Sequence, residues 1–292
     1  MSITILVTGS TGTIGTQVIK QLTEHPGVLV RAAVRSVGKA DAVRALGAEP
    51  VEFDWTRPET LAAAVQGVDK VFLLTPFAPD QVELAQKLID AAKAAGVKHI
   101  VKLSALGCEY EPGIQLGRWH RAVEKAIEAS GIAYTFVRPN NFMENFINYY
   151  PPAPDGNIYL PFGQGAVSWV DGRDVAAVAV AALLGSGHEG KAYPVTGSEA
   201  LNLEQVAQTI SQASGRPVRF IDVPEDAARG AMLGMQLPEW MVNAMMELHG
   251  LNKAGHAAVV APTVQEVTGR APRSFSDFAR DNASAWQPRS AS

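Results

Sequence analysis

A glycine-rich turn near the N-terminus constrains the fold of this chain more than any other feature. An apolar run over residues 3–7 leads into Gly9, Gly12 and Gly15, and a helix-like segment follows over residues 17–22. Glycine lets a backbone turn sharply and approach an anion closely, and the first amides of a following helix direct N–H groups and a positive dipole end at that anion. The order of strand, turn and helix therefore predicts a site for the pyrophosphate of a dinucleotide. The expected contacts are Thr8, Gly9, Thr11, Gly12, Thr13 and Ile14.

The glycine spacing is Gly-x-x-Gly-x-x-Gly, whereas the commonest dinucleotide fingerprint is Gly-x-Gly-x-x-Gly. The turn therefore matches this fingerprint in the way it would bind an anion and in its place between a strand and a helix, but not in its exact spacing. A plain strand-to-helix turn remains the alternative unless a second strand and helix unit follows.

A second unit does follow, since residues 28–35 have the composition of a strand. The position where many dinucleotide-binding proteins carry an acid for the ribose hydroxyls is occupied here by Arg35. A guanidinium can bind a 2′-phosphate through two hydrogen bonds and stack on adenine, so Arg35 predicts NADP(H) in preference to NAD(H). Lys39 is expected to add positive charge. A solvated arginine at a strand end is the alternative.

Strand and helix patterns continue to alternate along the first half of the chain. This alternation implies right-handed crossovers and a parallel sheet with helices on both faces, so we predict a doubly wound α/β Rossmann fold. The further strands are expected at residues 50–53, 70–74, 98–103 and 133–137, and the further helices at residues 58–65, 80–95 and 117–129.

The alternation breaks at the prolines of residues 151–154. We therefore predict an NADP-binding Rossmann domain over residues 1–150 and a smaller α/β substrate lobe over residues 151–292, from which the chain can cross back to the Rossmann sheet. The lobe's expected elements are short strands at residues 157–160 and 166–170, a helix at 173–184 capped by Asp171, a helix at 203–213 capped by Asn202, and a loose tail after Trp286.

Composition excludes several classes of function. The net charge of −4 provides no basic surface for nucleic acid, and no apolar run is long enough to span a membrane. Cys108 is the single cysteine, so an intrachain disulfide or a thiolate metal site is excluded. We expect a cytoplasmic monomer or homodimer with no metal, no membrane and no nucleic acid partner.

Ligands of open α/β sheets bind at the carboxyl ends of the strands, so the residues that follow each expected strand are site candidates. Asp54 is expected beside adenine, and Thr75 and Asn140 are expected near the nicotinamide half of the dinucleotide. Pro76 and Ser104 are further expected contacts of the cofactor. Such residue types also favour turns, which is the alternative reading.

The glycine turn, Ser104-Ala105 and Arg138-Pro139-Asn140 resemble the extended, atypical branch of the short-chain dehydrogenases/reductases. Residues 120–135 resemble the NmrA-like group of that branch, and the resemblance spans nearly the whole chain. This group includes flavin-free azo dye, quinone and triphenylmethane dye reductases. The resemblance therefore implies an oxidoreductase that uses NADP(H) without flavin.

The chain lacks the Tyr-x-x-x-Lys dyad with which the wider superfamily protonates its substrates. His120 and Glu124 stand at the matching helix, one turn apart. His120 is either a general acid oriented by Glu124 or a packed structural side chain. Ser104 and Tyr110 are further candidate hydrogen-bond donors to the substrate.

Without that dyad, the expected acceptor is a small conjugated aromatic electrophile, because conjugation spreads the charge that hydride brings. An azo dye or a quinone has this property. The expected apolar wall of the site comprises Phe77, Phe142, Phe146, Trp169, Met232 and Met235, with Tyr149, Tyr150 and Trp240 nearby. These side chains can equally form core.

Two functions remain open at this point. The first is NADPH-dependent reduction of an aromatic acceptor. The second is a redox sensor of the NmrA type, which binds the dinucleotide and regulates a partner without turnover. An epimerase or dehydratase is a third option, which the missing dyad opposes.

Overall fold

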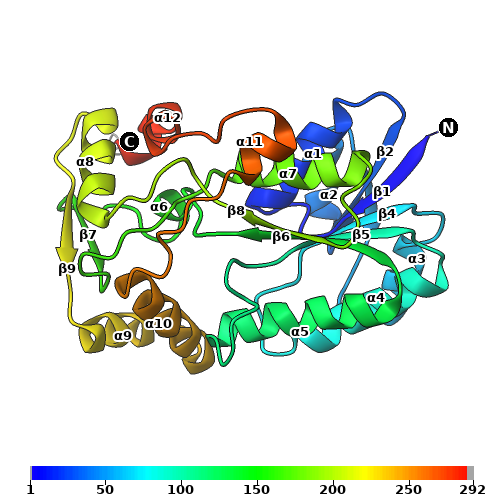
Figure 1. Ribbon diagram of the computed structural model, residues 1–292, viewed down its shortest axis with the longest axis horizontal. Helices are drawn as coiled ribbons and strands as arrows, with labels where there is room; N and C mark the ends of the chain where they lie inside the picture. Colours follow the sequence, from blue (N-terminus) through cyan, green and yellow to red (C-terminus); the bar gives the residue numbers. More distant parts are fainter. Residues whose placement is uncertain (1, 288–292) are drawn as a thin grey trace. The chain divides into compact units, whose positions relative to one another are not determined.

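The computed structural model describes residues 2–287 and divides into two compact units (Figure 1). The first unit runs to Pro139 and includes Gly172–Val195, and the second comprises Asn140–Asp171 and the chain from Thr196 onward. Apart from Gln287, the tail expected after Trp286 lies outside the described residues.

The first unit contains a seven-stranded sheet in which all neighbouring strands are parallel, in the order β3-β2-β1-β4-β5-β6-β8. The strand order reverses between β1 and β4, which makes the carboxyl ends of these strands the expected ligand position. The doubly wound α/β prediction is confirmed. The strands are β1 (Ile3–Val7), β2 (Val28–Val34), β3 (Glu49–Glu52), β4 (Lys70–Leu73), β5 (His99–Leu103), β6 (Ala133–Pro139) and β8 (Lys191–Val195).

Helices cover both faces of this sheet, α1 and α7 on one side and α4 and α5 on the other (Figure 1). An apolar core lies beneath α3, α4 and α5 and includes Leu61, Leu88 and Ile127, each at most 1% exposed. Burying one such side chain contributes about 1.5–3 kcal/mol. The helices are α1 (Thr13–Thr23), α2 (Ala40–Arg44), α3 (Pro58–Ala64), α4 (Gln81–Ala94), α5 (Gln115–Ser130) and α7 (Gly172–Leu184), with a 3₁₀ turn at Val37–Lys39.

The chain returns to the first unit after Asp171. Helix α7 packs against α1, β5 and β6, and β8 pairs with β6. The compact units therefore have different bounds from the 1–150 and 151–292 division expected from sequence, because the apolar α7 is buried against the Rossmann sheet. Strand β8 was not predicted, since it is short and its first two residues are exposed.

The second unit combines a two-stranded parallel sheet of β7 and β9 with helices around an aromatic core. Asn202 caps α8 in a capping box with Gln205, as its position predicts. The strand expected at 166–170 is wrong, because this segment makes only isolated bridges, one of them between Val167 and Leu201. The elements are α6 (Asn145–Asn148), β7 (Asn157–Leu160), α8 (Leu203–Ser214), β9 (Arg219–Asp222), α9 (Glu225–Gly234), α10 (Glu239–Lys253), α11 (Thr263–Thr268), α12 (Phe275–Asp281) and a 3₁₀ turn at Ala283–Trp286.

Candidate active site

Thr8 anchors the glycine turn at the switch point of the sheet. Its hydroxyl lies 3.2 Å from the carbonyl oxygen of Phe72 and 3.0 Å from that of Leu74, and it accepts the N–H of Leu74 at 2.8 Å. Ser10 adds a buried hydrogen bond of 2.5 Å from its hydroxyl to the carbonyl oxygen of Ala33. The turn is thereby tied to both neighbours of β1, which are β4 and β2.

Two glycines of the turn cannot be replaced without strain. Gly9 has a φ of +62°, a conformation that L side chains rarely adopt. A Cβ on Gly15 would lie 2.2 Å from the carbonyl oxygen of Gly9. The missing side chain of Gly15 therefore lets α1 approach the turn closely, as a dinucleotide fingerprint requires.

The N-terminus of α1 has the electrostatic character of an anion site. Gly12 is the N-cap residue, no side chain caps the helix, and its first turn contains no acidic residue. Thr11 and Thr13 are exposed, whereas Ile14 is buried and fixes the helix to the core. Since the first N–H groups of a helix lack intrahelical partners, this end suits a phosphate.

Arg35 follows β2 directly and is exposed. Within residues 2–287, its guanidinium makes no hydrogen bond or ion pair, so it is available to a ligand. Asp54 follows the neighbouring strand β3, and its carboxylate accepts the N–H and the hydroxyl of Thr56 at 2.9 and 2.8 Å. These bonds lower the pKa of Asp54, and the nearby charge of Arg35 lowers it further.

The end of β4 carries two further candidates of the first unit. Thr75 is buried, and its hydroxyl donates to Gln81 Oε1 at 3.1 Å. Phe77 is 39% exposed and meets Trp119 edge to face, with ring centroids 6.1 Å apart. Thr75 is therefore held by α4, and Phe77 presents an aromatic surface to solvent. Their roles, and that of Pro76, stay predictions.

A buried ionic cluster lies behind the end of β5. Glu124 is fully buried and accepts two hydrogen bonds from Arg138, at 2.9 and 2.8 Å, and one from Ser104 at 2.7 Å. Burial opposes the charged form of Glu124, yet the bonds from Arg138 and Ser104 hold its pKa below the ordinary value. Cys108 lies in the same cluster, where burial raises its thiol pKa to about 11 and leaves it unreactive.

His120 is hydrogen-bonded to Lys102 rather than to Glu124. Lys102 Nζ lies 2.9 Å from His120 Nδ1 and 2.8 Å from the carbonyl oxygen of Leu103. The expectation that Glu124 orients His120 is therefore wrong, because the buried carboxylate takes its opposite charge from Arg138. Burial and the neighbouring Lys102 charge lower the pKa of His120 well below the ordinary value, so its imidazole is neutral at pH 7.

The other two candidate hydrogen-bond donors to the substrate differ in their exposure. The Ser104 hydroxyl is buried and donates to Glu124, whereas Tyr110 is 70% exposed on the loop after β5. Their assignment as substrate donors stays a prediction.

Sequence reasoning missed Lys102, which this geometry places beside a predicted site residue. A signal was present in the sequence, since Lys102 interrupts the apolar residues Ile100, Val101 and Leu103 of the expected strand. A charged side chain at such a position requires a partner.

The candidates of the second unit divide by burial. The Asn140 amide donates to Ser168 Oγ at 2.7 Å and to the carbonyl oxygen of Ala257 at 2.8 Å. Phe146 and Trp169 are buried in the core with ring centroids 4.7 Å apart, whereas Met235 is 73% exposed. Phe142 and Met232 are half-buried. Core packing accounts for Phe146 and Trp169, and the substrate roles of all these residues stay predictions.

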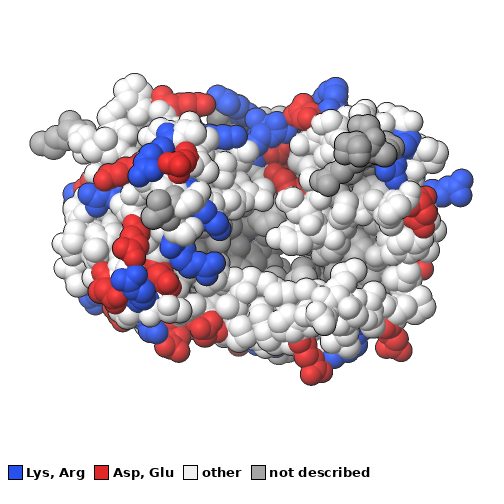
Figure 2. Space-filling view, turned by 180° about the vertical axis from the view of Figure 1, so that it is seen from behind, with Lys and Arg blue, Asp and Glu red and all other residues white. Residues whose placement is uncertain are grey.

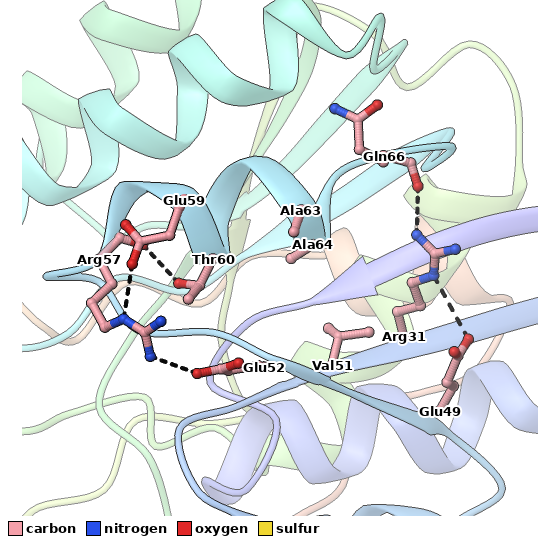
Figure 3. Close-up of a pocket in the computed structure, with 10 residues that line it drawn as sticks. All are labelled: Arg31, Glu49, Val51, Glu52, Arg57, Glu59, Thr60, Ala63, Ala64 and Gln66. Carbon is pink, nitrogen blue, oxygen red and sulfur yellow. Dashed lines mark hydrogen bonds and ion pairs between the residues drawn. The ribbon is translucent and has the colours of Figure 1, made fainter.

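A separate hollow of about 490 Å³ lies along the edge strand β3 (Figure 3). Its charged side chains pair with one another: Arg57 binds Glu52 at 2.6 Å and Glu59 at 2.9 Å. Arg31 donates to the carbonyl oxygen of Gln66 at 2.5 Å and lies 3.7 Å from Glu49. The hollow shares no lining residue with the glycine turn or the buried cluster.

Acidic and basic side chains are interspersed on the face shown in Figure 2, without a large area of one sign. Among residues 2–287, no three His, Cys, Asp or Glu side chains are grouped so that they could hold a metal ion. None of the helices within residues 2–287 has the length and apolar character of a membrane span.

The chain is similar to reductases of known sequence. Over 283 residues, the chain is 45% identical to the NAD(P)H azoreductase of Xenophilus azovorans, covering 97% of this chain and 99% of that protein. It is 40% identical over 291 residues to the (4-alkanoyl-5-oxo-2,5-dihydrofuran-3-yl)methyl phosphate reductase of Streptomyces griseus, covering 97% and 99%.

A similar solved structure is the NADPH-dependent quinone oxidoreductase QOR2 of Escherichia coli in complex with NADPH. The TM-score is 0.85 at 28% identity, covering 95% of this chain and 99% of that one. The sequence also matches the NmrA-like family over residues 1–278, which confirms the resemblance seen in its motifs. This chain belongs to the NmrA-like family.

Proposed function

We propose that this protein is an NADPH-dependent, flavin-independent reductase of a conjugated aromatic acceptor such as an azo dye or a quinone. The observation that carries the proposal is the glycine turn, in which a Cβ on Gly15 would lie 2.2 Å from the Gly9 carbonyl oxygen beside an uncapped helix N-terminus. The names of the azoreductase and quinone oxidoreductase relatives support the same activity.

The residues present fit NADP(H). The amides at the start of α1 would hold the pyrophosphate, and Gly9 and Gly12 would let it approach the backbone. The Arg35 guanidinium, which makes no hydrogen bond or ion pair within residues 2–287, would bind the 2′-phosphate, and no acid replaces it at the end of β2 to bind a ribose hydroxyl. When bound, the dinucleotide supplies the hydride.

A conjugated acceptor is proposed because the chain lacks the dyad that would protonate an ordinary ketone. Hydride added to an ordinary ketone produces a strongly basic alkoxide, which needs a positioned donor. The chain lacks the tyrosine and lysine dyad, and the Ser104 hydroxyl is bound to Glu124. A quinone or an azo bond spreads the incoming charge over a conjugated system, so orientation and a weaker donor suffice.

Turnover with purified protein tests the proposal. The protein is mixed with NADPH and a panel of azo dyes, quinones and triarylmethane dyes, and absorbance is followed at the NADPH and dye bands. We expect consumption of NADPH matched to the acceptor, with one NADPH for each quinone and two for each azo bond cleaved to amines. The purified protein should be colourless, and added flavin should not raise the rate.

The same experiment separates the reductase from a sensor. If NADPH binds in a fluorescence titration and no acceptor in the panel is consumed, the redox-sensor function is supported instead. If NADPH does not bind, both functions are excluded.

A further inference from the structure

Lys102 occupies an unusual position for a lysine. It is the fourth of five residues of β5 and is completely buried. Its ammonium has hydrogen-bonding partners in the Leu103 carbonyl oxygen, at 2.8 Å, and His120 Nδ1, at 2.9 Å. Burying an unpaired ammonium is costly, so a lysine here requires these partners. The pair joins the end of β5 to the second turn of α5.

We propose that Lys102 is a positioning residue that holds His120 as a neutral imidazole with its proton on Nε2, and that His120 donates this proton to the reduced acceptor. This inference rests on the proposed reductase function. It adds the proton source and the residue that prepares it.

The tautomer of His120 follows from the hydrogen-bond donors of Lys102. An ammonium has three N–H donors and no acceptor, so His120 Nδ1 must accept and the imidazole proton must be on Nε2. Within the described residues, Nδ1 is the only ring nitrogen of His120 that makes a hydrogen bond. Nε2 also keeps solvent-accessible surface, so Nε2–H is available to a substrate atom.

The charges around the pair favour this protonation state at neutral pH. Burial lowers the pKa of Lys102 to about 8, with Arg138 acting in the same direction and Glu124 and Cys108 opposing it. Lys102 is thus mostly an ammonium at pH 7. Burial and the positive charge of Lys102 both lower the pKa of His120, so the imidazole is neutral.

The proton transfer balances with one proton from solvent. After hydride addition, the electron pair left on the acceptor oxygen or nitrogen takes the proton from His120 Nε2. The N–H bond at Nε2 breaks as Nδ1 receives a proton from the Lys102 ammonium. A proton from solvent then binds Nε2 as Nδ1 returns its proton to the Lys102 amine, which restores the starting tautomer. Two electrons arrive with the hydride, and neither side chain changes oxidation state.

The tautomer is measured directly by NMR on protein labelled with ¹⁵N-histidine and bound to NADPH. At pH 7, we expect His120 to be neutral with the proton on Nε2. In Lys102→Met, the tautomers should mix and the pKa of His120 should rise toward the ordinary value, because a positive neighbour is lost. Lys98→Met is the matched control, since Lys98 is an exposed lysine just before the same strand and pairs with Asp69. A wild-type His120 that is protonated on Nδ1, or on both nitrogens, overturns the proposal.

The pH profile of kcat with NADPH and a quinone tests the proton delivery. We expect kcat of the wild type to fall above about pH 8, where Lys102 loses its proton. Lys102→Met and His120→Gln should each lower kcat roughly 10²-fold, remove this alkaline limb and leave KM within a few fold. Lys98→Met should keep the wild-type profile, and melting curves identify any variant that fails to fold.

The outcomes separate the two proposals. Quinone reduction with wild-type kcat in His120→Gln overturns the proton role and leaves the reductase intact. If the wild type reduces no acceptor, the proton role fails together with the proposed function, and the NMR result alone decides whether Lys102 positions His120.

Discussion

Arg138 holds Glu124 through two parallel hydrogen bonds, Nε to Oε1 at 2.9 Å and Nη2 to Oε2 at 2.8 Å. The carboxylate is fully buried on α5, and the guanidinium projects from β6. Arg121, Ser104 and the Cys108 thiol also donate to the carboxylate. The pair and its partners therefore join helix α5, strand β6 and the loop after β5 at the edge of the sheet where the site is proposed.

Replacing Glu124 by Gln should destabilise the protein by about 3 kcal/mol or more, because within residues 2–287 it leaves Glu109 as the only ionic partner of the largely buried Arg138 guanidinium. Chemical denaturation followed by circular dichroism measures the loss. Glu128→Gln is the control on the same helix, where the carboxylate is 33% exposed and pairs with Arg121. That change should cost less than about 1 kcal/mol. Equal losses would contradict the importance assigned to the buried pair.

Gly15→Ala should displace the glycine turn, because the added methyl group would overlap the Gly9 carbonyl oxygen. We expect a loss of roughly 1–3 kcal/mol in unfolding free energy and at least about tenfold weaker NADPH binding by calorimetry. Gly230→Ala is the matched control, since Gly230 lies in α9 with open space around it. It should leave binding unchanged and stabilise the helix by up to about 1 kcal/mol. Unchanged NADPH affinity in Gly15→Ala would argue against a pyrophosphate at this turn.

Arg35→Asp should weaken NADPH binding far more than NADH binding, since the 2′-phosphate is present only in NADPH. The loss of a charge-assisted contact of about 1.5–3 kcal/mol corresponds to a 10- to 100-fold weaker NADPH affinity, against a few fold for NADH. Arg219→Asp makes the same charge change on an exposed arginine of β9 and should alter neither affinity. Equal losses for the two dinucleotides would contradict the phosphate role of Arg35.

Stability should fall as the pH drops from about 6.5 to about 4, because two buried histidines are neutral in the folded state. Burial lowers the pKa of His99 and of His249 to about 4, so the unfolded chain binds more protons in this window and unfolding becomes easier. Each contributes about 3 kcal/mol that is fully present above pH 6.5. Denaturation from pH 8 to pH 4 measures the slope, and His249→Gln should reduce it. A slope unchanged in that variant would show that other groups cause the loss.

Sequence reasoning succeeded where structure depends on neighbours along the chain. The strand, glycine turn and helix of residues 3–23 form as predicted, and Asn202 caps α8 through a bond to the third residue after it. The alternation of strands and helices also determined the parallel sheet, because a parallel connection requires a crossover. The family resemblance was also recognised from motifs whose residues are close together in the sequence.

The residues around His120 could not be predicted in this way, because their partners are distant in sequence. Lys102 reaches His120 across 18 positions, and Glu124 reaches Arg138 across 14. Helical spacing paired His120 with Glu124, but a buried carboxylate is stable only beside an opposite charge, and folding placed Arg138 there. The amino-acid sequence thus determined the sheet and its glycine turn through local backbone preferences. Tertiary structure alone decided which buried charges meet, since that choice depends on desolvation and on packing between separate elements.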